Sequence, residues 1–209
     1  MMQRWDFTTA PADAQRDEIV QTLRAGGVVL LPTDTIYGLH ALATDRAAAD
    51  RVAEIKGRDD TKPFVVLGAG LVQLEEIGID ARPEVRNALL ELWPAPLTAI
   101  LPLRHPIPAS RGAASLAVRV PALEWLRELV ARTGPILSTS ANRSGEPPIS
   151  DPKYLARELQ NKLDGLADSG PSTGQPSAIV DFTGDEPRLI REGDVFFTQK
   201  VWKTLRISL

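Results

Sequence analysis

Short apolar runs alternate along the chain with stretches in which apolar residues recur every three or four positions. The runs predict buried strands, and the recurring positions predict helices with one apolar face. The expected strands are residues 28–31, 64–67, 97–101, 116–120, 136–138, 178–182 and 188–191. The expected helices are residues 14–25, 46–56, 83–92, 123–130 and 151–163.

Residues at the expected helix ends agree with these positions. Asp13 and Asp45 are predicted N-caps, and Gly57 and Gly134 are predicted stops. Helices and strands alternate in the first half, whereas shorter strands cluster in the second half. This order predicts an α/β fold with a twisted sheet, partly parallel and partly antiparallel, flanked by helices. No repeat or linker interrupts it, so we expect one domain over residues 1–209.

Composition removes several classes of protein. The 209 residues are 43% apolar and 24% charged, which suffices for a buried core and excludes a fully disordered chain. The absence of cysteine excludes a disulfide framework and a cysteine nucleophile. The net charge of −3 argues against a protein coated in positive charge. The N-terminus lacks a signal pattern and no apolar run approaches ~20 residues, so a cytoplasmic location is expected.

Three common motifs are not supported by the sequence. Residues 170–174 match Gly-x-Ser-x-Gly, but a nucleophile elbow needs a helix after it and the next expected element is a strand. Gly68-Ala69-Gly70 begins like a dinucleotide fingerprint, but Gln73 stands where the third glycine belongs. A P-loop pattern does not occur. Serine hydrolases, dinucleotide enzymes and P-loop NTPases are therefore disfavoured.

Three polar segments follow predicted elements in places where α/β sheets bind ligands. They are Pro32-Thr33-Asp34-Thr35-Ile36-Tyr37-Gly38, residues 56–63 and residues 138–145. Taken alone, the first and third also fit ordinary polar turns. The second places Arg58 and Lys62 beyond the Gly57 helix stop, where cations no longer benefit from the helix dipole, so a phosphate-binding loop explains them better.

Together with three further motifs, these segments resemble one family. The order and spacing are similar to those of the YrdC-like threonylcarbamoyl-AMP synthases over about residues 15–195. The motifs that carry the resemblance are Pro32-Thr33-Asp34-Thr35-x-Tyr37-Gly38, Lys56-Gly57-Arg58, Trp93-Pro94-x-Pro96-Leu97-Thr98, Val118-Arg119-Val120-Pro121, Ser140-Ala141-Asn142-x-Ser144-Gly145 and Leu189-Ile190-Arg191-x-Gly193. The chain ends before the extra C-terminal domain of longer members, so the short, single-domain form is expected.

The resemblance implies a concave, positively charged cavity and a nucleotidyltransferase. The expected reaction joins L-threonine, bicarbonate and ATP into threonylcarbamoyl-AMP and releases pyrophosphate. This product feeds the threonylcarbamoyl modification of adenosine in tRNA, so tRNA and other proteins of that transfer machinery are expected partners. Mg²⁺ is expected to arrive with ATP and to keep most of its waters, and no protein metal ligand is assigned.

The resemblance also assigns roles to individual residues. The implied catalytic residues are Lys56 and Arg58, the implied ATP contacts are Arg58, Lys62, Ser115, Ser140, Asn142 and Arg191, and the implied threonine contacts are Thr35, Arg119, Ser138 and Ser177. Arg119 suits the carboxylate of threonine because a guanidinium binds a carboxylate through two parallel hydrogen bonds. A site built from cations and hydroxyls suits phosphoryl displacement, which depends on positioning and charge stabilisation.

Departures from the family pattern keep two alternatives open. Ala95 replaces a glycine, Pro148 stands where a serine is common, and Ala178 replaces a threonine. These changes leave room for an RNA-binding paralogue with little synthase activity, although only 5% of the residues are aromatic and available for base stacking. The other alternative is a carbamoyl-adenylate enzyme, which normally forms part of a larger protein.

Overall fold

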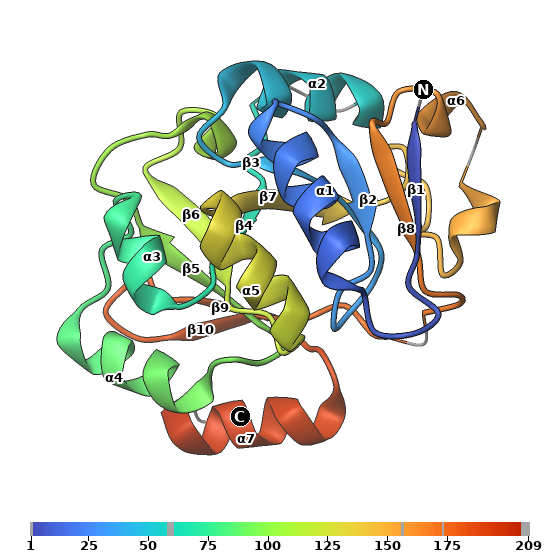
Figure 1. Ribbon diagram of the computed structural model, residues 1–209. Coiled ribbons are helices and arrows are strands. Elements are labelled where there is room, and N and C mark those ends of the chain that lie inside the picture. The colour runs from blue at the N-terminus through green and yellow to red at the C-terminus, as the bar shows by residue number, and fades with distance from the viewer. Residues whose placement is uncertain (1, 58–60, 156, 173, 206–209) are drawn as a thin grey trace.

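The chain folds around one mixed sheet with helices on both of its faces (Figure 1). The computed structural model describes residues 2–57, 61–155, 157–172 and 174–205. Its strands are β1 (Gln3–Asp6), β2 (Val29–Leu31), β3 (Gly38–Leu42), β4 (Val65–Leu67), β5 (Leu97–Pro102), β6 (Ser115–Arg119), β7 (Ile136–Ser140), β8 (Gly165–Asp168), β9 (Ala178–Asp181) and β10 (Arg188–Arg191). Its helices are α1 (Asp13–Arg24), α2 (Arg46–Lys56), α3 (Leu71–Glu76), α4 (Pro83–Leu92), α5 (Glu124–Thr133), α6 (Arg157–Gln160) and α7 (Val195–Leu205), with 3-10 turns η1 (Pro108–Ser110) and η2 (Pro152–Tyr154).

The sheet order is β1-β8-β2-β3-β7-β4-β6-β5-β9-β10. The pairs β1–β8, β2–β8, β4–β6 and β5–β9 are parallel. The pairs β2–β3, β3–β7, β4–β7, β5–β6 and β9–β10 are antiparallel. The predicted mixed sheet flanked by helices is therefore confirmed.

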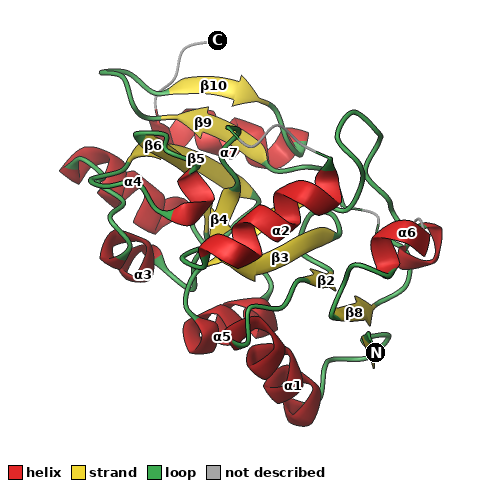
Figure 2. Ribbon diagram, turned by 90° about the horizontal axis from the view of Figure 1, so that it is seen from above, coloured by secondary structure: helices red, strands yellow, loops and turns green. Residues whose placement is uncertain are grey.

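Side chains that alternate along the strands supply two apolar layers. One layer packs Leu30 and Leu39 with residues of α2 and α4. The other packs Leu31 and Ile136 with residues of α1 and α5. Figure 2 shows α2 on one face of the central strands and α1 and α5 on the opposite face.

Local sequence explains where several helices begin and end. Asp45 Oδ1 accepts a hydrogen bond from the Ala48 N–H at 3.1 Å, and α2 ends at Gly57 with φ +55°. The prediction of Asp13 as the cap of α1 is wrong by one residue. Ala12 occupies the cap position because the Gln15 side chain reaches back and accepts the Ala12 N–H at 3.0 Å.

The helix predicted over residues 151–163 is wrong in extent. Leu155, Leu159 and Leu163 are all buried in the core, which produced the helical spacing. The backbone of Leu155 is extended, with φ −62° and ψ 123°, so η2 and the short helix α6 replace a continuous helix. Sequence periodicity also missed β1, β3 and β8, together with α3 and α7.

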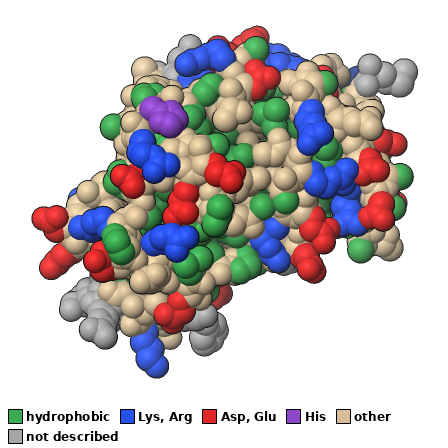
Figure 3. Space-filling view, turned by 60° about the vertical axis from the view of Figure 1, so that its left-hand side comes forward, with side chains coloured by type: hydrophobic (Ala, Val, Ile, Leu, Met, Phe, Trp, Pro, Cys, Tyr) green, Lys and Arg blue, Asp and Glu red, His purple; other side chains and the backbone are tan. Residues whose placement is uncertain are grey.

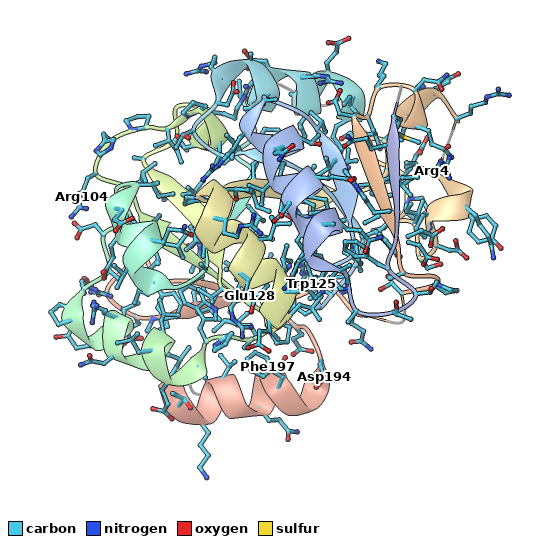
Figure 4. All side chains as sticks on the ribbon, viewed as in Figure 1. Arg4, Arg104, Trp125, Glu128, Asp194 and Phe197 are labelled. Atoms are coloured by element: carbon cyan, nitrogen blue, oxygen red, sulfur yellow. The ribbon has the colours of Figure 1, made fainter. Side chains whose placement is uncertain are left out.

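Helix α7, which follows β10, covers part of the larger core layer. Asp194 Oδ1 accepts the Phe197 N–H at 3.0 Å and so caps the first turn of α7, and both residues are labelled in Figure 4. Phe197 packs against the larger core layer, and Val201 is fully buried. Of the helices described, each is too short or too polar to cross a membrane.

Candidate active site

Hydroxyl and guanidinium groups gather around a cavity of about 320 Å³ at the sheet. Side chains alternate between the two faces of each strand. Leu97, Val118 and Leu137 belong to the core layer of α2, so the residue that follows each of them faces the opposite side of the sheet. The polar side chains that line the cavity include Thr35, Thr98, Arg119, Ser138, Ser177 and Arg191. These residues come from strands β5, β6, β7 and β10, from the residue before β9, and from the loop between β2 and β3.

Arg119 is the buried cation of this cavity, with only 4% of its surface exposed. Its Nη1 donates to Thr35 Oγ1 at 2.8 Å, and its Nη2 lies 3.6 Å from Asp34 Oδ1. The Arg119 Nε is buried without a hydrogen-bond partner among the described residues. Burial lowers the pKa of Arg119, the Asp34 carboxylate opposes that shift, and the Arg191 charge adds to it. An anion beside Arg119 would reduce its repulsion from Arg191.

Arg191 and Thr98 fix the position of Ser177. Arg191 donates to the Ser177 carbonyl through Nε at 3.1 Å and Nη2 at 2.9 Å. Thr98 Oγ1 and Ser177 Oγ are hydrogen-bonded at 2.8 Å. Burial lowers the pKa of Arg191. Thr98 is 1% exposed, and sequence reasoning did not select it although it belongs to the quoted motif that ends in Leu97-Thr98.

Lys56 anchors the loop that follows β7. Its ammonium donates to the Ser140 carbonyl at 2.7 Å and to Asn142 Oδ1 at 2.8 Å. The Lys56 carbonyl in turn accepts the Ser144 N–H at 2.9 Å. Lys56 and Asn142 are both buried and do not line the cavity, whereas Ser140 does. The Lys56–Asn142 pair therefore holds the loop from its buried side.

Tyr37 fixes a second loop beside the cavity. Its hydroxyl donates to the Gly170 carbonyl at 2.8 Å and accepts the Ser169 N–H at 2.9 Å. Ser172 Oγ donates to the Thr35 carbonyl at 3.1 Å. Gly174 lies so close that a Cβ there would come within 1.5 Å of the Thr35 carbonyl oxygen. Only glycine therefore fits at position 174 in this arrangement.

The structure gathers most of the predicted site residues. Thr35, Arg119, Ser138, Ser140, Ser177 and Arg191 line the cavity, and Lys56 and Asn142 lie buried beneath one of its loops. Lys62 is exposed and is not among the cavity residues. Ser115 lies four residues from Arg119 on β6, about 13 Å away along the strand. Arg58 lies outside the described residues, and all of these assigned roles stay predictions.

The three departures lie in different places. Pro148 lines the cavity, where it supplies apolar surface and cannot donate a hydrogen bond. Ala178 is buried in the core layer of α2, and its N–H donates to the Pro96 carbonyl at 3.0 Å. Ala95 is also buried in that layer. Only Pro148 therefore changes the surface that a ligand meets.

His40 is a titratable side chain buried beside this site. It is fully buried, and neither ring nitrogen has a hydrogen-bond partner among the described residues. Burial, followed by the nearby Arg119 charge, lowers the pKa of His40 to about 3, while the carbonyl groups of Leu31 and Leu137 act weakly in the opposite direction. The imidazole is therefore neutral at neutral pH.

The carboxylates near the site and the charges on the surface bear on metal and nucleic-acid binding. Among the described residues, no three His, Asp or Glu side chains gather to hold a metal ion. Asp34, the carboxylate nearest Arg119, accepts the Ala122 N–H through Oδ2 at 2.9 Å. On the face drawn in Figure 3, basic and acidic side chains are interspersed. Such a face is unlike the continuous basic stripe that binds a nucleic-acid backbone.

Curated relatives carry a common description. The threonylcarbamoyl-AMP synthase of Bacillus subtilis (strain 168) is 32% identical over 188 residues, which are 88% of this chain and 54% of that protein. The threonylcarbamoyl-AMP synthase of Stenotrophomonas maltophilia (strain K279a) is 40% identical over 172 residues, or 79% of this chain and 92% of that protein. The chain thus spans about half the length of the Bacillus relative and nearly all of the Stenotrophomonas relative.

Solved structures and a family model agree with this similarity. Pyrococcus abyssi Sua5 complexed with L-threonine has a TM-score of 0.86 and 30% identity, covering 100% of this chain and 62% of that chain. Escherichia coli YciO has a TM-score of 0.81 and 25% identity, covering 93% of this chain and 97% of that chain. The family model Sua5_yciO_yrdC, described as telomere recombination, matches residues 21–193. The chain belongs to the Sua5/YciO/YrdC family.

Proposed function

We propose that this protein is an L-threonylcarbamoyladenylate synthase. The observation that carries the proposal is the buried Arg119, which faces a hydroxyl-lined cavity with its Nε unpaired. Relatives named threonylcarbamoyl-AMP synthase support it, and so does a relative crystallised with L-threonine. Its substrates are L-threonine, bicarbonate and ATP, and it works in the cytoplasm.

Arg119 binds the α-carboxylate of L-threonine in this proposal. A guanidinium donates two parallel hydrogen bonds to a carboxylate, and burial excludes the water that would compete for them. Thr35, Ser138 and Ser177 supply the remaining polar contacts to the amino acid. All four residues line the same cavity, which is consistent with one small polar substrate.

The chemistry then requires two steps. The threonine amine condenses with bicarbonate to form an N-carboxylate and water. A carboxylate oxygen of that group attacks the α-phosphorus of ATP, and pyrophosphate leaves with the electrons of the broken P–O bond. Charge accumulates on the phosphate oxygens during this displacement, so fixed cations and hydroxyls accelerate it without a histidine base.

The nucleotide half of the site rests on Arg191 and Ser140, with Arg58, Lys62, Ser115 and Asn142 as further proposed contacts. Lys56 contributes by holding Asn142 and the loop that carries Ser140. Mg²⁺ enters with ATP and is held mainly by phosphate oxygens and water, because Asp34 already faces Arg119 and the Ala122 N–H. The adenylate is passed on to the proteins that modify tRNA.

An assay of pyrophosphate release tests the proposal. The purified protein is incubated with ATP and Mg²⁺, and L-threonine and bicarbonate are omitted in turn. We expect release only when both are present, with threonylcarbamoyl-AMP as the product in mass spectrometry. Release at the same rate without threonine would contradict the synthase activity and favour a general ATP-hydrolysing enzyme.

A further inference from the structure

The hydroxyl groups of Thr33 and Thr35 can be oriented in one way only, because each of them carries a single hydrogen to donate. Thr33 Oγ1 lies 2.8 Å from the Ile36 carbonyl oxygen, 2.9 Å from Thr35 Oγ1 and 3.1 Å from the Thr35 nitrogen. A hydroxyl has one hydrogen, and a carbonyl only accepts. Thr33 therefore donates to Ile36 and accepts from the Thr35 N–H. The remaining contact is satisfied only when the Thr35 hydroxyl donates to Thr33.

Arg119 completes the orientation of Thr35. Its Nη1 donates to Thr35 Oγ1 at 2.8 Å, so that oxygen has already given its hydrogen and used one acceptor position. A hydroxyl oxygen accepts two hydrogen bonds, which leaves one acceptor position on Thr35 and no donor. Thr35 is 3% exposed and lines the cavity, so water competes little for that position.

We propose that Thr33 is a positioning residue that makes the Thr35 hydroxyl a dedicated acceptor for an N–H or O–H group of the amino-acid substrate. The proposal rests on the synthase function above and assigns the polarity of its amino-acid subsite. L-Threonine offers such donors at its amine and its side-chain hydroxyl. Its carboxylate cannot donate, so that group is left to the donors of Arg119.

The same polarity separates the two substrates. Ionised phosphate oxygens of ATP are acceptors, and an acceptor facing an acceptor leaves both groups unpaired. Thr35 consequently disfavours a phosphate group at its end of the cavity. This holds even though the positively charged Arg119 lies within hydrogen-bonding distance of Thr35. The geometry thus reserves this end for the amino acid and leaves the phosphates to the cations elsewhere in the site.

Removing the Thr33 hydroxyl tests this role with matched variants. Thr33→Val keeps the shape and loses the acceptor, whereas Thr33→Ser keeps the hydroxyl. Calorimetry with L-threonine and with ATP gives the two affinities, and thermal unfolding monitors the fold. We expect Thr33→Val to weaken threonine binding roughly 3- to 10-fold, the size of one hydrogen bond, and to leave ATP binding unchanged. Thr33→Ser should bind threonine like the wild type.

A double variant distinguishes positioning from an independent contact. If Thr33 acts through Thr35, then Thr33→Val adds no further loss of threonine affinity in a Thr35→Val background. Additive losses would overturn the proposal, and so would equal losses for threonine and ATP. Thr22→Val is the matched control, because among the described residues the Thr22 hydroxyl bonds to Gln3 and to Glu18 of α1, away from the cavity.

L-Valine identifies which substrate group donates to Thr35. A Thr33→Val protein that loses affinity for threonine but not for valine, so that its preference for threonine falls by the same factor, would place the side-chain hydroxyl at Thr35. An equal loss for both amino acids would place the amine there, and both results support a donor at Thr35. Unchanged affinity for both would overturn the positioning role alone. A wild-type protein that does not bind threonine would overturn the synthase proposal as well.

Discussion

The ammonium of Lys56 donates a hydrogen bond to Asn142 Oδ1 at 2.8 Å in the protein interior. This contact joins the C-terminal end of α2 to the loop after β7, two segments separated by 86 positions in the chain. The Asn142 amide nitrogen also donates to the Arg143 carbonyl at 2.9 Å, so the side chain is held at both ends. The hydrogen bond between Lys56 and Asn142 thus connects the Lys-x-Arg and Ser-x-Asn motifs directly, in addition to their proposed roles in one site.

Replacing Asn142 by alanine should destabilise the protein. The change removes one acceptor from a buried ammonium, and lost hydrogen bonds to charged groups cost about 1.5–3 kcal/mol. Urea denaturation of Asn142→Ala should show a free energy of unfolding lowered by that amount. Ser144→Ala is the matched control, because Ser144 is exposed and contributes its backbone N–H to the Lys56 carbonyl. Equal stability of the two variants would show that the Lys56–Asn142 bond contributes nothing.

The neutral His40 should make stability depend on pH. The unfolded chain binds a proton at His40 with the ordinary pKa of 6.5, whereas the folded protein does so only near pH 3. Its contribution to stability is therefore complete above pH 6.5. As the pH falls from 6.5 to 3, that contribution is lost by up to about 1.4 kcal/mol per pH unit.

Comparison with a His40→Asn variant isolates this effect from that of the carboxylates. Urea denaturation of both proteins between pH 7 and pH 4 gives the difference in unfolding free energy at each pH. We expect the wild type to lose stability faster than the variant as the pH falls. Parallel curves would show that His40 titrates in the folded protein as it does in the unfolded chain.

The sequence predicted correctly those helices and strands whose apolar positions and end residues match the way the element is buried in the fold. The run 28–31 is wholly apolar because β2 is buried on both faces, and α2 lies between a capping Asp45 and a left-handed Gly57. Strand β3 was missed because it contains Gly38 and His40, which are poor indicators of a buried strand. The position of β3 in the sheet depends on its pairing with β2 and β7. The residues of β3 alone do not reveal these pairings.

The same distinction applies to the site. Motif resemblance selected Thr35, Arg119, Ser138, Ser140, Ser177 and Arg191, which the fold brings to one cavity. It did not select Thr33 or Thr98, whose significance lies in hydrogen bonds to other site residues. The burial of Lys56 was also not foreseen, because position in a motif does not reveal whether a charged group faces the ligand or a loop.

Adding a methyl group at Gly174 should disrupt the amino-acid subsite. A Cβ there would lie 1.5 Å from the Thr35 carbonyl oxygen, so Gly174→Ala must push the loop away from Thr35. Misplacement of a binding group by about 1 Å costs roughly 100-fold in catalysis. We expect a fall of that order in kcat/KM for threonine. Gly184→Ala is the control, since among the described residues its Cβ would meet only the Glu186 carbonyl oxygen at 3.9 Å, and it should retain full activity.

Arg119→Lys should weaken threonine binding while sparing ATP. A lysine ammonium keeps the positive charge but cannot donate two parallel hydrogen bonds to a carboxylate. The loss should be about 1.5–3 kcal/mol, the value of a hydrogen bond to a charged group. Isothermal calorimetry with each substrate measures both affinities. A variant that binds threonine like the wild type would place the carboxylate elsewhere in the cavity.

The last prediction concerns the choice of amino acid. A pocket that hydrogen-bonds a substrate hydroxyl leaves its own polar groups unpaired when that hydroxyl is missing, and discrimination reaches ~10⁴-fold. Valine has nearly the shape of threonine but lacks the hydroxyl, whereas serine keeps the hydroxyl and loses a methyl worth ~1–3 kcal/mol. We therefore expect kcat/KM to decrease in the order threonine, serine, valine, measured by pyrophosphate release with saturating ATP and bicarbonate. Equal values for threonine and valine would show that the hydroxyl groups around Thr35 do not recognise the substrate side chain.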